Sequence, residues 1–155
     1  MKFLHTLGTV GMLGALAAML ILHTLLPPTQ ELAGYVTVRV AISRIAEWLL
    51  LPSLGMVLVS GLLAMAVGKY FQNAGWAWAK LAMGVVMFEG TLLAVQGPAQ
   101  REARLAESAG AGEASVSDLA LSLSSEWYSI WVIALLATLN IVLGIWRPKF
   151  GRKAR

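Results

Sequence analysis

The sequence contains no cysteine. Disulfide bonds, thiolate metal sites, iron–sulfur clusters and cysteine nucleophiles are therefore all excluded. The chain also lacks a glycine-rich phosphate loop, the histidine and glutamate spacing of a zinc hydrolase, and any nucleophile with a recognisable base beside it. These absences argue against the common classes of soluble enzyme. We predict no catalytic residue and no metal site.

Charge is scarce as well. Only 13% of the 155 residues are charged, whereas 58% are hydrophobic, and the mean hydropathy is +0.72. This composition is far more apolar than that of soluble domains. Each membrane-crossing helix needs about 20 apolar residues, and the chain contains four such stretches. We therefore predict an all-α integral membrane protein with a single transmembrane domain, residues 1–155, since no length remains for a second folded unit.

The four stretches predict a four-helix transmembrane bundle with up-down topology. Their approximate bounds are 3–26, 44–67, 76–95 and 127–146. A proline pair ends the first span, Gly97-Pro98 ends the third, and Pro52 is expected to kink the second. The polar segment at about 98–125 is expected to form a loop. A cleaved signal peptide is the alternative for the first span, but the apolar run continues well past the small residues at cleavage spacing.

Lysine and arginine residues are distributed unevenly about these spans. Eight lie on one side: Lys2, Lys69, Lys80, Arg147, Lys149, Arg152, Lys153 and Arg155. Four lie on the other: Arg39, Arg44, Arg101 and Arg104. Short segments rich in basic residues stay in the cytoplasm, so both ends of the chain are predicted to be cytoplasmic and the 98–125 loop extracytoplasmic. Topology also accounts for the basic tail, and we expect no nucleic-acid partner.

The two histidines, His5 and His23, are the candidates for cofactor binding. They are 18 residues apart, which is five helical turns, so they project from the same face of the first span about 27 Å apart. Two haem b groups near opposite membrane faces would suit this spacing, each held by one histidine with a methionine or with a histidine of another chain. The methionines concerned are Met56, Met65, Met83 and Met87. The alternative, which we favour, is that both rings are polar groups at the two interfaces.

Glu89 is the only acidic residue well inside a predicted span. A central charge costs roughly 2.5 to 3.5 kcal/mol on insertion scales, so the side chain should find a partner or stay protonated. Arg44 at the start of the second span is the preferred partner, although Glu47, three residues later, competes for it. The alternative is a neutral carboxyl group bonded to a nearby polar side chain. The candidates for that bond are Ser60, Thr91 and Asn140.

Small residues recur along one stretch of the first span. They are Gly8, Gly11, Gly14 and Ala15. The hydrophobic effect does not drive helices together inside a bilayer, and small residues are what allow helix backbones to approach closely there. We therefore expect this stretch to pack against a neighbouring helix. A ligand lying against these residues is the alternative.

The opening KFLHTLGTVGMLG resembles the start of a bacterial superfamily of small membrane proteins that includes the copper-resistance protein CopD and the HemJ-type protoporphyrinogen oxidases. The segments EWLLLPSLGMVLVSGLLAM and WRPKF are more similar to a related family of predicted bacterial integral membrane proteins of unknown function. The resemblance implies a four-helix fold in the bacterial inner membrane. It also matches His5 to a first-span histidine of the HemJ-type proteins, which are associated with haem and porphyrin.

The predicted function is that of an accessory or scaffold subunit that assembles with other membrane components. Its predicted partners are the lipid bilayer and either another membrane protein or further copies of the same chain. Haem-linked electron transfer or porphyrin handling at His5 and His23 is the alternative. Enzymatic activity is the less favoured interpretation, because the sequence offers no constellation of catalytic groups.

Overall fold

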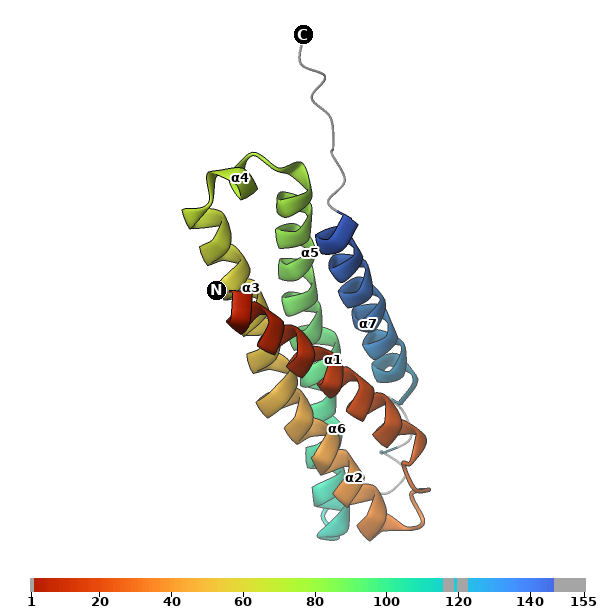
Figure 1. Ribbon diagram of the computed structural model, residues 1–155. Helices are drawn as coiled ribbons and strands as arrows, with labels where there is room; N and C mark the ends of the chain where they lie inside the picture. The colour runs from red at the N-terminus through yellow and green to blue at the C-terminus, as the bar shows by residue number, and fades with distance from the viewer. Residues whose placement is uncertain (1, 116–118, 120–122, 147–155) are drawn as a thin grey trace.

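The computed structural model describes residues 2–115, 119 and 123–146 (Figure 1). All the long elements of this part of the chain are helices, which confirms the predicted all-α class. They are α1 (Lys2–Thr24), α2 (Leu32–Ile45), the π-helical turn η1 (Ala46–Leu50), α3 (Leu51–Val67), α4 (Lys69–Gln72), α5 (Gly75–Thr91), the π-helical turn η2 (Leu92–Gln96), α6 (Gly97–Gly110) and α7 (Leu123–Trp146). Four stretches of helix are long and apolar enough to cross a bilayer: Lys2–Thr24, Leu32–Val67, Gly75–Gly110 and Glu126–Trp146. The chain is a multi-pass membrane protein.

Two of the helices are much longer than a bilayer is thick. α2, η1 and α3 form one continuous helix of 36 residues, and α5, η2 and α6 form another of 36 (Figure 1). At 1.5 Å per residue each is about 54 Å long, whereas the hydrocarbon core is about 30 Å thick. α1, with 23 residues, and the apolar part of α7, with 21, match that thickness. Each long helix is therefore longer than the core requires. We call the helices α2 and α6, which pack against each other, the α2–α6 pair.

The two ends of the bundle differ. We call the end with Lys2, α4 and Trp146 the near end, and the end with Thr24 and Gly110 the far end. In Figure 1 the α2–α6 pair lies at the bottom, and α1 crosses the long helices obliquely. The near end carries the short link between α3 and α5, whereas α6 ends at the far end.

Each long helix passes through a proline without ending. Pro52 and Pro98 are the second residues of α3 and α6, and each follows a five-residue π-helical turn. In these turns the N–H of Leu51 donates to the carbonyl of Ala46, and the N–H of Gly97 donates to that of Leu92. A proline has no N–H, and its ring clashes with the carbonyl four residues earlier in an α-helix. The wider π turn accommodates both defects.

This continuity corrects two of the predicted boundaries. The third span was expected to end before Gly97-Pro98 and residues 98–125 to form a loop, but the helix continues through α6 to Gly110. The second span was expected to begin at Arg44, but its helix begins at Leu32. α6 buries small residues and one carboxylate on the side that faces α2. They are Ala99, Glu102, Ala103, Ala106 and Ala109. The sequence feature that indicates the packing of α6 against α2 is the spacing of its alanines by three and four residues, and not its overall hydropathy.

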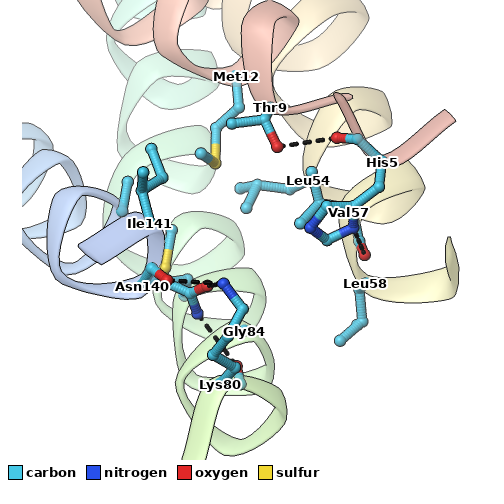
Figure 2. A pocket seen from close by; sticks show the side chains of 12 residues that line it. His5, Thr9, Met12, Leu54, Val57, Leu58, Lys80, Gly84, Asn140 and Ile141 are labelled. Atoms are coloured by element: carbon cyan, nitrogen blue, oxygen red, sulfur yellow. Dashed lines mark hydrogen bonds between the residues drawn. The ribbon is translucent and has the colours of Figure 1, made fainter. Parts of the chain in front are cut away.

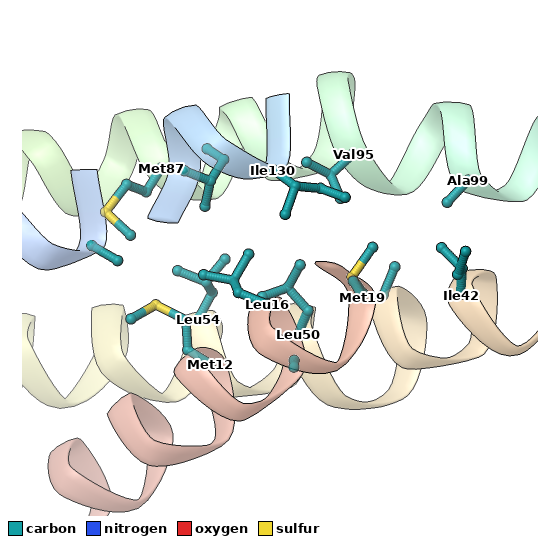
Figure 3. Close-up of a cluster of buried hydrophobic side chains, with 14 residues drawn as sticks. Met12, Leu16, Met19, Ile42, Leu50, Leu54, Met87, Val95, Ala99 and Ile130 are labelled. Atoms are coloured by element: carbon teal, nitrogen blue, oxygen red, sulfur yellow. The ribbon is translucent and has the colours of Figure 1, made fainter. Parts of the chain in front are cut away.

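The main hydrophobic core lies where α1 and α7 pack against the two long helices (Figure 3). α1 contributes Met12, Leu16 and Met19, and Ile130 comes from α7. The long helices supply Ile42, Leu50, Leu54, Met87, Val95 and Ala99. This core brings polar residues of all four spans to two places, one toward each end of the bundle.

Candidate functional site

The first polar site is centred on Arg39 of α2, whose side chain is fully buried. Its Nη1 donates to Glu126 Oε2 of α7 at 2.7 Å, and Glu126 is fully buried too. One turn earlier on α2, the hydroxyl of Tyr35 accepts a hydrogen bond from Arg39 Nε at 3.3 Å. Removing two charges from water costs several kcal/mol per ion, so such a pair persists only with close geometry and further hydrogen bonds.

Two further helices join this ion pair. His23 near the end of α1 places Nε2 3.5 Å from Glu126 Oε2, and Glu102 of α6 places Oε2 4.0 Å from Arg39 Nη2. We call the five residues His23, Tyr35, Arg39, Glu102 and Glu126 the far-end cluster. The cluster connects α1, α2, α6 and α7 where the bundle meets the projecting α2–α6 pair. It is a buried network of charged and polar side chains that links four helices.

The sequence pattern did not indicate the far-end cluster. Arg39 was counted only among the basic residues that set the topology, and Glu126 was assigned no functional role. Hydropathy reports the length of a span and not which side chains of different spans meet. The one available signal was the spacing of Tyr35, Arg39 and Ile42, which places an arginine on the buried face of α2.

The second polar site lies toward the near end, where α5 meets α7. Lys80 Nζ donates to the Asn140 backbone carbonyl at 2.6 Å and to Asn140 Oδ1 at 2.7 Å. In return, Asn140 Nδ2 donates to the Lys80 carbonyl at 3.0 Å. A Cβ on Gly144 would lie 2.8 Å from Lys80 Nζ, so glycine leaves room for the ammonium group. Lys80 was counted only among the basic residues on the cytoplasmic side, but its side chain turns into the bundle.

His5 lies across a small cavity from Lys80 (Figure 2). Its Nδ1 is 3.2 Å from the Val57 carbonyl and 3.0 Å from Ser60 Oγ on α3. Because a carbonyl only accepts, the bond to Val57 requires the proton on Nδ1, which leaves a lone pair on Nε2. The cavity, also lined by Thr9, has a volume of about 40 Å³, which is room for only a few water molecules.

His23 is placed differently from His5. Its Nδ1 lies 2.8 Å from the Met19 carbonyl, and its Nε2 faces Glu126 in the far-end cluster. The side chain is only 5% exposed, and its ring stacks at a tilt on Trp127 with centroids 5.9 Å apart. Both ring nitrogens therefore face protein groups of the bundle. The structure does not bring His5 and His23 into one site.

Glu89 has no hydrogen-bond or ion-pair partner among the described residues, and its side chain is exposed on the outside of α5. The preferred partner, Arg44, instead lies with Nη1 3.4 Å from Glu47 Oε2. The alternative partners also make other contacts. Ser60 bonds to His5 and to the carbonyls of Met56 and Val57. Asn140 bonds to Lys80, and Thr91 is buried inside the bundle. Among the described residues, Glu89 therefore lacks the partner that the sequence led us to expect. Hydropathy could not show that Glu89 lies on the face turned away from the bundle.

No group of three His, Asp or Glu side chains within residues 2–115, 119 and 123–146 is arranged to hold a metal ion. Comparison of the chain with known protein families, with curated proteins and with solved structures found no match.

Proposed function

We propose that the chain is an accessory subunit that assembles with another membrane protein through the outer face of α5. The observation that carries this proposal is Glu89, an ionisable side chain exposed on a helix within the bilayer. Ionisable residues in spanning helices almost always face a bundle interior or a partner. Since Glu89 faces outward here, we assign the groups that contact its carboxylate to a second protein.

The neighbours of Glu89 form a continuous face. Residues at spacings of three and four along α5 and η2 are all exposed, and we call them the α5 stripe: Trp78, Ala82, Val85, Val86, Glu89 and Leu93. Val86 is 59% exposed and Leu93 77%. The stripe is apolar except for one carboxylate near its far end. Such a face is typical of a helix that packs against another transmembrane helix.

A photocrosslinking amino acid at Val86 is expected to give a discrete protein adduct in native membranes. The adduct should weaken strongly when Glu89→Gln is added, because the charged group that orients the contact is lost. The matched control is the same photoprobe at Leu63 of α3, which is 45% exposed and lies outside the stripe. Adducts of equal intensity at both positions, or none at Val86, would refute the proposed role of the α5 stripe.

Haem binding at His5 is the second candidate. It is favoured by the Nδ1 bond to Val57, since a ligating histidine normally donates its other N–H to a carbonyl and keeps Nε2 for the metal. The resemblance of the first span to the HemJ-type proteins adds to it. The cavity beside His5 is far smaller than a ligand pocket, so a haem would have to lie at the bundle surface or against a partner.

The visible spectrum of the purified protein tests this candidate. Haem bound at His5 should give a Soret band that shifts on dithionite reduction, that disappears in His5→Ala and that persists in His23→Ala. His5→Gln should not restore the band, since an amide is a poor iron ligand. A protein that stays colourless after haem is added would remove haem from the proposal.

We also propose that the chain lies in the bacterial inner membrane with both termini in the cytoplasm. The support is the excess of lysine and arginine at the near end. After Arg155, a reporter that works only in the cytoplasm should be active. At Gly110, a reporter that works only in the periplasm should be active. Activity of both fusions on the same side would contradict this topology.

A further inference from the structure

We infer that the partner at the α5 stripe is a transmembrane helix of a different protein that carries one lysine or arginine in the far half of the bilayer. This inference rests on the proposed function and names the chemistry of the partner. The depth of Glu89, the shape of the α5 stripe and the contacts of the described cations support it.

The depth of Glu89 sets the depth of the partner's cation. Glu89 is seven residues before Gln96, the last residue of η2, and therefore about 10 Å from that level. The packing of α7 against α5 gives the same depth. Ile133 contacts the position of Gly90, the residue next to Glu89, and Ile133 is seven residues after Glu126, where the apolar part of α7 begins. The complementary group must reach this level from its own helix. A lysine or arginine can do so, because its long stem is compatible with apolar surroundings.

The stripe suits a single helix laid along α5. From Trp78 to Leu93 it covers 16 residues, or about 22 Å of helix, which is most of a bilayer core. Ala82 is small and leaves room for a close approach of backbones. Glu89 is the one residue of the stripe that could distinguish one apolar helix from another. An oppositely charged group on the partner would supply both register and specificity.

No described residue of a second copy provides that group. Arg39 is engaged with Glu126, and Lys80 with Asn140. Arg44 is exposed, but it lies 11 residues before Gly55, whose Cβ position meets Phe88, and is therefore about 16 Å from the level of Glu89. Lys2 and Lys69 lie at the near end, and Arg101 and Arg104 lie 12 and 15 residues beyond Glu89 on its own long helix, about 18 and 22 Å away. Two copies related by a twofold axis along the stripe would instead bring one Glu89 carboxylate toward the other. Charge complementarity among the described residues therefore favours a different protein.

A model peptide tests the inference without knowledge of the natural partner. The probe is a leucine-rich transmembrane peptide with one lysine seven residues from its end, and its control has leucine at that position. The full chain, labelled through Ala111→Cys at the exposed turn after α6, is reconstituted with the peptide in phosphatidylcholine vesicles. Energy transfer between the two labels reports association. The cysteine label is unique because the natural sequence contains no cysteine.

The lysine peptide is expected to associate roughly tenfold more tightly than the leucine peptide. Glu89→Gln should abolish this preference, whereas Glu107→Gln, the same change on an exposed residue of α6 outside the stripe, should preserve it. Equal binding of the two peptides, or a preference unchanged by Glu89→Gln, would overturn the inference. Stronger association between two labelled copies than with the peptide would assign the stripe to a second copy. A Val86 adduct in native membranes without any lysine preference would overturn this inference alone and leave the accessory role standing.

Discussion

Arg39→Met is expected to lower the free energy of unfolding by about 3 to 5 kcal/mol. The substitution keeps much of the apolar stem but removes the cation that lies 2.7 Å from Glu126. Glu126 is fully buried, so its carboxylate would be left in surroundings that stabilise a charge poorly. Tyr35 would also lose the donor to its hydroxyl. Denaturant titration of the purified protein in mild detergent, followed by tryptophan fluorescence, measures the change.

Arg44→Met is the matched control for this prediction. Arg44 also lies beside a glutamate, but its side chain is 66% exposed and its Nη1 is 3.4 Å from Glu47. Exposed pairs contribute at most about 1 kcal/mol, so this variant should be nearly silent. Adding Glu126→Leu to Arg39→Met should recover much of the loss, because replacing both members of a buried pair is far less costly than removing one. Equal stability of the two single variants would show that the far-end cluster does not hold the helices together.

The sequence predicted the membrane class and the number of spans because both follow from hydropathy summed over about 20 residues. The helix α3 ends at Val67, where the second apolar stretch was expected to end. The prediction failed at the far end, where Pro98 was taken as a helix end. Hydropathy and proline position cannot reveal a π-helical turn, whose hydrogen bonds let a helix continue through proline.

The candidate site was predicted less well, because the spans are apolar on nearly all sides and show no clear face. Lys80 was counted only as a basic residue on the cytoplasmic side, but it bonds to Asn140, 60 residues away. Arg39 and Glu126 are 87 residues apart, and no local pattern joins them. The Arg44–Glu47 contact was foreseen as the competing pair, since residues three apart on a helix are neighbours. Local spacing is readable from the sequence, whereas the rotation of one helix against another is not.

Gly8→Leu is expected to destabilise the bundle by about 3 kcal/mol and to separate α1 from α3. A Cβ on Gly8 would lie 2.8 Å from the Ser53 backbone carbonyl and 3.0 Å from Val57 Cγ2. A backbone atom in the middle of a helix cannot move aside, so α1 itself would have to shift. The His5 bonds to Val57 and Ser60 depend on the same contact and should be lost with it.

Leucine at the three glycines of α1 is expected to destabilise the bundle to different extents. At Gly11 the nearest atom to an added Cβ is Ser53 Oγ, which belongs to a side chain that can rotate, so Gly11→Leu should cost less than Gly8→Leu. At Gly14 an added Cβ would meet nothing within 4 Å, so Gly14→Leu should be close to neutral. Denaturant titration in detergent should rank the losses Gly8, Gly11, Gly14. A loss at Gly14 as large as that at Gly8 would contradict the packing of α1 on α3, because helix propensity favours leucine equally at each position.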